Sequence, residues 1–317
     1  MLTSMASPEL SPVILRDPDG GLEASILPHA GMLVTSLRHD GEELLGQRRG
    51  LTAYLRDGKT MGIPLLHPWA NRVGSDHFEI EGTEVDLDGE RPGLRRDPHG
   101  LAIHGVLAAE PGWRVEHAPP EAAGAQALVA TFDFGARPDL LASFPFPHVL
   151  SYRVELTGGA LALELTVTAT GAVPVPVAHG LHPYLTLPGV PRADWHVQLP
   201  ARRHLVLDGR GLPTGDATDE PVWEGALADL AFDDAYDGLA PCSVFRVEGG
   251  GRRLTTTFEA GYPAGQVFAP REDSVICFEP MAAPTNALVT GQGLRLIAPG
   301  CQDVARVVIA VERLVGR

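Results

Sequence analysis

LSYRVELTGGALALELTV, residues 150–167, consists of two runs of alternating apolar residues on either side of a Thr-Gly-Gly turn. Every second residue of 150–156 and of 161–167 is apolar. Successive side chains of a strand point to opposite faces of a sheet, so this spacing is typical of strands with one buried face. Two such runs joined by a tight turn predict an antiparallel β-hairpin.

The same spacing recurs outward from this hairpin. Strands are predicted at 78–80 and 85–87, joined by a Glu-Gly turn, and at 128–134, 254–258 and 304–311. The chain's 36 glycines and 28 prolines are spread along its whole length, where they separate short segments as turn residues do. Only residues 223–232 approach helical spacing, and we expect one or two helical turns there. Residues 119–126, rich in Pro, Ala and Gly, predict a long loop. The sequence therefore predicts an all-β antiparallel sandwich or barrel with few short helices.

The length of 317 residues fits one large β domain. An average domain has about 150 residues, but β sandwiches and barrels often exceed this. We find no internal repeat of roughly 20 to 50 residues that would indicate a propeller or solenoid. We therefore expect a single domain over residues 1–317, with residues 1–12 as a flexible N-terminus.

The composition limits the possible partners. The chain has 40 acidic and 25 basic residues, a net charge of -15, which argues against nucleic acid and weakly favours a neutral substrate over a phosphorylated one. Its three cysteines are too scattered for a disulfide framework or a zinc motif. No signal peptide or membrane-spanning segment is recognisable, so we expect a cytoplasmic protein without a membrane partner.

Residues 274–281, SVICFEPM, form an apolar strand that ends in a carboxylate. Alternation places Glu279 on the same face as Val275 and Cys277. A buried carboxyl has its pKa raised by desolvation, as a general base working near neutral pH requires. Alternatively, Glu279 points to water at the end of the strand or caps the turn at Pro280.

Residues 177–185, VAHGLHPYL, place two histidines among apolar residues. Histidine is a suitable acid near pH 7, and the Tyr184 hydroxyl could bind a ligand hydroxyl. Alternatively, His179 and His182 are core residues bonded to backbone carbonyls. A shared metal is not expected, because residues three apart on a strand point to opposite faces.

Residues 62–74, GIPLLHPWANRVG, bring Trp69, Asn71 and Arg72 together. An aromatic face beside amide and guanidinium donors suits a carbohydrate. The alternative is a Trp in the core and a solvated Arg. The His-containing turn at 97–105 and the paired Asp233 and Asp234 are, taken alone, typical of loops.

Taken in order, these segments resemble the aldose 1-epimerase (galactose mutarotase) family. The similar residues run from Gly31 to Asn286 and include Pro-Trp-Ala-Asn-Arg at 68–72, Ile-His-Gly at 103–105, His-Pro-Tyr-Leu at 182–185 and Phe-Glu-Pro-Met-Ala-Ala-Pro-Thr-Asn-Ala-Leu at 278–288. The resemblance implies a large antiparallel β-supersandwich with a sugar site in a groove across one sheet. It implies neither a metal nor an organic cofactor.

The resemblance also assigns roles to individual residues. It implies Glu279 as general base and His182 as general acid, although Leu185 stands where the family more often has an aromatic residue and His179 is a competing imidazole. The implied substrate-binding residues are Arg72, His104, Asp233, Tyr184, Asn71 and Trp69, with Asp234 as an alternative to Asp233 and Trp69 only as a neighbour of Arg72. The implied activity is interconversion of the α and β anomers of a free hexose.

Two other functions fit the same residues. One is a mutarotase for a hexose 6-phosphate or another acidic sugar, for which Arg95 and Arg96 form the basic pair, unless they are merely exposed. The other is a carbohydrate-binding protein without catalysis, although a binder needs no acid and base pair. A hydrolase or lyase is not supported by paired carboxylates in a recognisable context. The sequence does not decide between a monomer and a homodimer.

Overall fold

The computed structural model describes residues 10–17, 19–116 and 124–314. Strands hold 51% of the residues and helices 7%, and the all-β prediction is confirmed. Residues 1–9 of the expected flexible N-terminus and 119–123 of the expected loop lie outside the described residues. The single-domain organisation stays a prediction.

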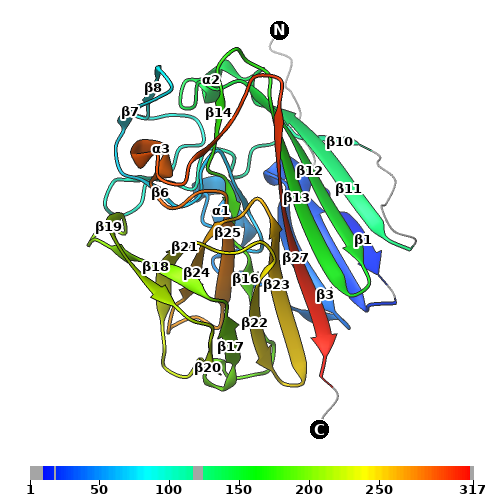
Figure 1. Ribbon diagram of the computed structural model, residues 1–317. Coiled ribbons are helices and arrows are strands. Elements are labelled where there is room, and N and C mark those ends of the chain that lie inside the picture. The colour runs from blue at the N-terminus through cyan, green and yellow to red at the C-terminus, as the bar shows by residue number, and fades with distance from the viewer. Residues whose placement is uncertain (1–9, 18, 117–123, 315–317) are drawn as a thin grey trace.

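A nine-stranded sheet extends from the upper right of the molecule to its lower end (Figure 1). The predicted hairpin forms the third and fourth strands of this sheet and is confirmed, with Leu156 opposite Leu161 and Thr157 opposite Ala160. The strands predicted at 128–134, 254–258 and 304–311 belong to the same sheet. In spatial order its strands are β10 Arg114–Glu116, β11 Gln126–Asp133, β12 His148–Thr157, β13 Ala160–Ala169, β27 Gln302–Arg313, β23 Arg252–Ala260, β22 Ser243–Gly249, β17 His196–Leu199 and β20 Trp223–Ala226.

An eight-stranded sheet lies beside it and contains residues 276–281, the strand that ends near Glu279 (Figure 1). Its strands are β19 Pro213–Glu220, β18 Arg202–Leu207, β21 Phe232–Asp237, β24 Ala264–Ala269, β25 Ile276–Met281, β15 Gly180–Leu181 and β5 Leu65–Leu66, with β16 Tyr184–Leu185 also paired to β25. All paired strands of both sheets are antiparallel. Ile276 and Phe278 of β25 belong to the large apolar cluster that also includes Leu163 and Ile309 of the nine-stranded sheet, so both sheets share one core.

The remaining elements are short and lie around these two sheets. The predicted hairpin at residues 78–87 is confirmed as β7 and β8. The other strands are β1 Val13–Asp17, β2 Leu22–Leu27, β3 Leu33–His39, β4 Glu42–Glu43, β6 Arg72–Val73, β7 His77–Ile80, β8 Thr83–Asp86, β9 Ala102–Ile103, β14 Val175–Val177 and β26 Arg295–Ile297. The helices are α1 Gly50–Asp57, α2 Pro138–Leu141, α3 Ala287–Thr290 and the 3₁₀ turns η1 Pro28–Ala30 and η2 Arg192–Asp194.

The prediction of helical turns at residues 223–232 is wrong. Trp223–Ala226 is the edge strand β20, which pairs with β17, and Phe232 begins β21. The Trp223 ring lies edge-on to Phe232 at 5.8 Å between ring centroids. Long-range pairing with β17 therefore overrides the local apolar spacing, as is common for short segments.

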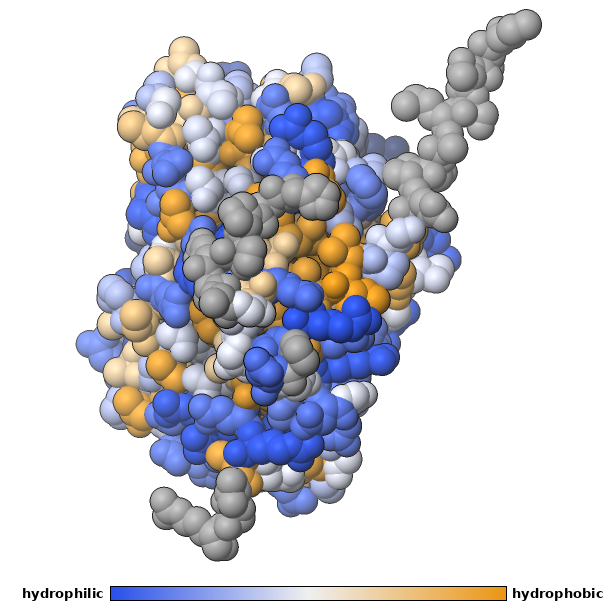
Figure 2. Space-filling model, turned by 90° about the vertical axis from the view of Figure 1, so that its right-hand side faces the viewer, coloured by the Kyte–Doolittle hydropathy of each residue, from blue (hydrophilic) through white to orange (hydrophobic). Residues whose placement is uncertain are grey.

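The surface on the side of β10 and β11 is largely hydrophilic, with apolar residues gathered near its middle (Figure 2). Among the described residues, none of the helices has both the length and the apolar composition needed to span a membrane.

Candidate active site

Glu279 lies in the middle of the eight-stranded sheet, on the face of β25 that turns away from the shared core. Ile276 and Phe278 pack into that core, whereas Cys277 packs with Tyr184 and Val275 in a separate small cluster. Alternation puts Glu279 on the Cys277 side of the strand. Glu279 is nevertheless buried, with only 2% of its surface exposed. The alternative that Glu279 points to water is therefore excluded.

His182 contacts Glu279 directly. Its Nε2 lies 3.3 Å from Glu279 Oε1 and 3.0 Å from the Tyr184 hydroxyl, which is 2.6 Å from Thr60 Oγ1. The two short strands on either side of His182, β15 and β16, both pair with β25. This interrupted pairing holds His182 over the strand that carries Glu279. The other ring nitrogen, Nδ1, is buried without a hydrogen-bond partner among the described residues.

Burial moves the pKa values of this pair in opposite directions. Desolvation raises the pKa of the Glu279 carboxyl well above its usual range, Asp233 adds to the rise, and Arg72 opposes it. Desolvation also lowers the pKa of the His182 imidazole well below its usual range, and His104 acts in the same direction. Burial therefore favours the uncharged form of the pair, a protonated carboxyl beside a neutral imidazole.

His179 lies on the opposite side of the same segment. Its ring stacks on His67 at 6.1 Å and meets Tyr262 edge-on at 5.8 Å between ring centroids. Neither ring nitrogen has a hydrogen-bond partner among the described residues. Desolvation, with smaller contributions from Arg295 and His148, lowers the pKa of His179 to about 3. The structure thus separates His179 from Glu279 and leaves His182 beside it.

A chain of hydrogen bonds links the other predicted polar residues. Arg72 donates from Nε to Asp97 Oδ2 at 2.7 Å and from Nη1 to Asn71 Oδ1 at 3.2 Å. Asn71 donates to Gln266 Oε1 at 3.2 Å, and Gln266 donates to Asp233 Oδ1 at 2.8 Å. Since Gln266 lies directly opposite Glu279 in the β24–β25 register, the chain runs beside the carboxyl.

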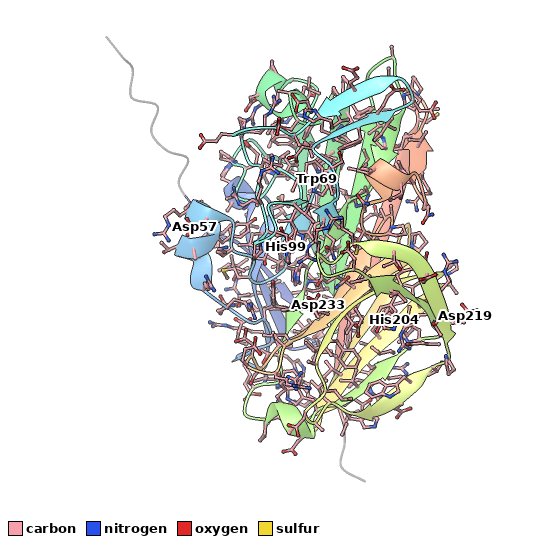
Figure 3. All side chains as sticks on the ribbon, turned by 90° about the vertical axis from the view of Figure 1, so that its left-hand side faces the viewer. Asp57, Trp69, His99, His204, Asp219 and Asp233 are labelled. Carbon is pink, nitrogen blue, oxygen red and sulfur yellow. The ribbon has the colours of Figure 1, made fainter. Side chains whose placement is uncertain are left out.

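The adjacent Asp234 lies on the other side of β21. It is 3.6 Å from His204 Nε2 and accepts a 3.4 Å hydrogen bond from Tyr236. The two aspartates point apart because they are consecutive on a strand. Figure 3 shows Asp233 between Asp57 on one side and His204 and Asp219 on the other. The geometry therefore favours Asp233 over Asp234 as the residue next to Glu279.

His104 is the third imidazole of the site. Its ring meets His182 edge-on at 5.6 Å between centroids, and its backbone has a φ of +62°. Desolvation, assisted by the Arg72 charge, lowers the pKa of His104 to about 3, so this ring is neutral at pH 7. A neutral ring can both donate and accept hydrogen bonds, as a sugar hydroxyl requires.

Trp69 is not brought into this group. It is 1% exposed and belongs to the apolar core, where its face packs against protein. Conversely, sequence reasoning missed Gln266, Thr60 and the pairing of Asp97 with Arg72. The only available signal for Gln266 was a single amide in the otherwise apolar strand AGQVFA, residues 264–269.

Donor atoms suited to a soft divalent metal also meet here. Ligand atoms of His182, Cys277 and Glu279 lie within 4.8 Å of one another, and all three residues are buried. Imidazole, thiolate and carboxylate are the ligand types of zinc. No other such group occurs within the ranges that the structure describes.

Comparison with known proteins identifies the family of the chain and similar folds. The family model described as aldose 1-epimerase matches residues 13–304. The Escherichia coli (strain K12) protein YihR, an uncharacterized protein, is 28% identical over 254 residues, which cover 75% of this chain and 77% of YihR. A galactose mutarotase-like protein from Clostridium acetobutylicum has a similar structure, with a TM-score of 0.79 at 17% identity over 93% of this chain and 94% of that one. The galactose 1-epimerase of Lactobacillus acidophilus NCFM gives a TM-score of 0.73 at 17% identity over 96% and 95% of the two chains. At these identities the structural similarity shows the fold.

Proposed function

Because the chain belongs to the aldose 1-epimerase family, we propose that it is a mutarotase that interconverts the α and β anomers of an aldose. The observation that carries the proposal is the 3.3 Å contact between His182 and Glu279 in a buried site. A sugar anomer changes configuration only through ring opening, which needs one group to accept a proton and another to donate one. Two such groups, held together, meet this need.

The proposed reaction begins with Glu279 as a carboxylate and His182 as an imidazolium. Glu279 accepts the proton of the C1 hydroxyl while His182 donates its proton to the ring oxygen. The bond between C1 and the ring oxygen breaks, and C1 becomes an aldehyde. After rotation about the C1–C2 bond the two transfers run in reverse, and the ring closes on the other face of the aldehyde.

The pKa shifts bear on the energy of the intermediate. When the sugar is open, Glu279 is protonated and His182 is neutral, which is the form of the pair that burial favours. Desolvation therefore stabilises the enzyme state that accompanies the aldehyde. A cyclic sugar meets the charged form after one proton moves from Glu279 to His182 across their contact.

The surrounding residues are proposed to hold the sugar hydroxyls. Arg72 and Asp233 offer a donor and an acceptor beside Glu279, and His104 offers a neutral ring beside His182. The Tyr184 hydroxyl bonds His182 and orients its ring. Positioning of this kind lets both proton transfers take place in one sugar geometry.

The test is the rate at which the α and β anomers interconvert. It is followed through their separate anomeric NMR signals and compared with the spontaneous rate. Glu279→Gln should remove the acceleration, a loss of about 10²- to 10⁴-fold, while circular dichroism shows an intact fold. Glu84→Gln, an exposed substitution in β8, is the matched control and should keep the wild-type rate. An undiminished rate in Glu279→Gln would remove this carboxyl from the mechanism. A wild-type protein that binds sugar without accelerating exchange would instead be a non-catalytic binding protein.

A further inference from the structure

A cavity of about 380 Å³ is lined by His104, whose ring meets that of His182 of the proposed catalytic pair. Thr60, Arg72 and His104 line it, and Thr60 is bonded to the tyrosine that contacts His182. Away from the pair, the cavity is lined by the end of α1 with the residues that follow it, 57–60, and by the loop at 95–98. A sugar with C1 at Glu279 would therefore have room for a substituent in this cavity.

Two of the four cations that line the cavity are neutralised by carboxylates. Arg72 is bound by Asp97 at 2.7 Å. Arg96, from the basic pair noted in the sequence, is exposed and bound by Asp76 at 2.9 Å. Arg96 therefore matches the expectation of an ordinary surface residue.

The other two cations, Lys59 and Arg95, have no ion pair among the described residues. Lys59 is the only lysine of the chain. Arg95 is half-buried, its Nε is buried without a hydrogen-bond partner, and its Nη1 makes only a long 3.4 Å bond to the Gly93 carbonyl. Asp57 also lines the cavity, but its carboxylate is held by Arg56 at 2.6 Å.

Gly58 makes room for the Arg95 side chain. A Cβ at Gly58 would lie 1.6 Å from Arg95 Nε, so only glycine leaves room for this side chain. Gly58 has a φ of +61°, which also favours glycine. The guanidinium is thus packed against backbone at the wall of the cavity.

We propose that Lys59 and Arg95 bind an acidic group, a phosphate or a carboxylate, carried by the sugar away from its anomeric carbon. The inference rests on the proposed mutarotase function and narrows its substrate to acidic aldoses. The charge of the whole chain favoured a neutral sugar, but binding depends on the charge inside the cavity. An anion there would pair two cations that the protein itself leaves unpaired, one of them partly desolvated.

The test compares four sugars with the full chain: glucose, galactose, glucose 6-phosphate and galacturonate. Anomer exchange is measured by NMR, and kcat/KM is taken above each sugar's spontaneous rate. The wild-type protein should prefer one acidic sugar over its neutral counterpart. The phosphate and carboxylate arms identify which acidic group is bound.

Variants of the two cavity cations then test whether the preference for acidic sugars arises in this cavity. Arg95→Gln and Lys59→Gln should each lower the ratio of acidic to neutral kcat/KM by about 10- to 100-fold, as expected for loss of a charge-assisted hydrogen bond. Arg49→Gln removes the same charge from an exposed residue before α1, outside the cavity lining, and should keep the wild-type ratio. Because Arg95 is packed, Lys59→Gln provides the second measurement if Arg95→Gln does not fold.

Two results would count against the inference, and they are distinguishable. A preference for neutral sugars, or a ratio unchanged in both cavity variants, overturns the acidic subsite and leaves the mutarotase proposal standing. Absence of acceleration for all four sugars overturns both.

Discussion

Replacement of the buried His179 by leucine should make the protein less sensitive to acid. The folded protein holds this imidazole neutral, with a pKa of about 3, whereas an unfolded histidine titrates near pH 6.5. Below pH 6.5 the unfolded state therefore binds a proton that the folded state does not, so stability falls as the pH falls from 6.5 toward 3. At pH 5, about 1.5 units below the unfolded pKa, this one residue costs roughly 2 kcal/mol.

The measurement is the free energy of unfolding from urea denaturation at pH 7 and pH 5. From pH 7 to pH 5 the free energy of unfolding of His179→Leu should fall by about 2 kcal/mol less than that of the wild type. The substitution leaves no hydrogen-bond partner of the ring unpaired, because neither ring nitrogen has one among the described residues. His99→Gln, at an exposed position, is the control. Its free energy of unfolding should fall as much as that of the wild type. Equal losses in His179→Leu and the wild type would refute the reasoning.

The same variant separates the two candidate acids. Because His179 lies in the core and His182 lies beside Glu279, His179→Leu should retain anomer exchange at pH 7. Loss of exchange in a folded His179→Leu protein would return His179 to the mechanism.

Three further predictions concern the site itself. Tyr184→Phe should lower kcat about fivefold through loss of one hydrogen bond to His182, with Thr60→Val giving a smaller loss in the same NMR assay. The pair works with one proton, which burial holds on Glu279, so acid inactivates the enzyme by adding a second proton, to the neutral His182. Because burial lowers the pKa of His182, the acid limb of the pH–kcat profile should lie below pH 6.5, and a limb above 6.5 would contradict this. Zn²⁺ should inhibit anomer exchange by binding His182, Cys277 and Glu279. In a titration of the rate with Zn²⁺, Cys277→Ser should raise the inhibitory concentration by about tenfold or more.

The features that sequence predicted well are those set by local spacing. The face of β25 that carries Glu279 follows from a two-residue period, and the hairpin at 150–167 follows from that period and a glycine turn. Both signals lie within a few residues of the chain. The helical prediction at 223–232 was wrong because the apolar spacing there fits more than one local structure, and pairing with a distant strand decided between them.

Local sequence patterns could not predict which side chains contact one another in the site. Opposite faces could be expected for His179 and His182, but which face meets Glu279 depends on how β15 and β16 pair with β25. Gln266 is an ordinary amide in an apolar strand until its register places it opposite Glu279. Trp69 joined the predicted sugar site through its neighbour Arg72, although its ring packs in the core.

The division between strands and loops at the site has a consequence for redesign. The proposed catalytic pair is held by β25 and by the two short strands that pair with it, whereas Lys59 and Arg95 lie on the connections after α1 and before β9. Connections tolerate sequence change better than paired strands do. Libraries that vary Lys59 and Arg95, and leave Thr60 and Asp97 in place, should therefore yield enzymes with new sugar preferences from one unchanged catalytic scaffold.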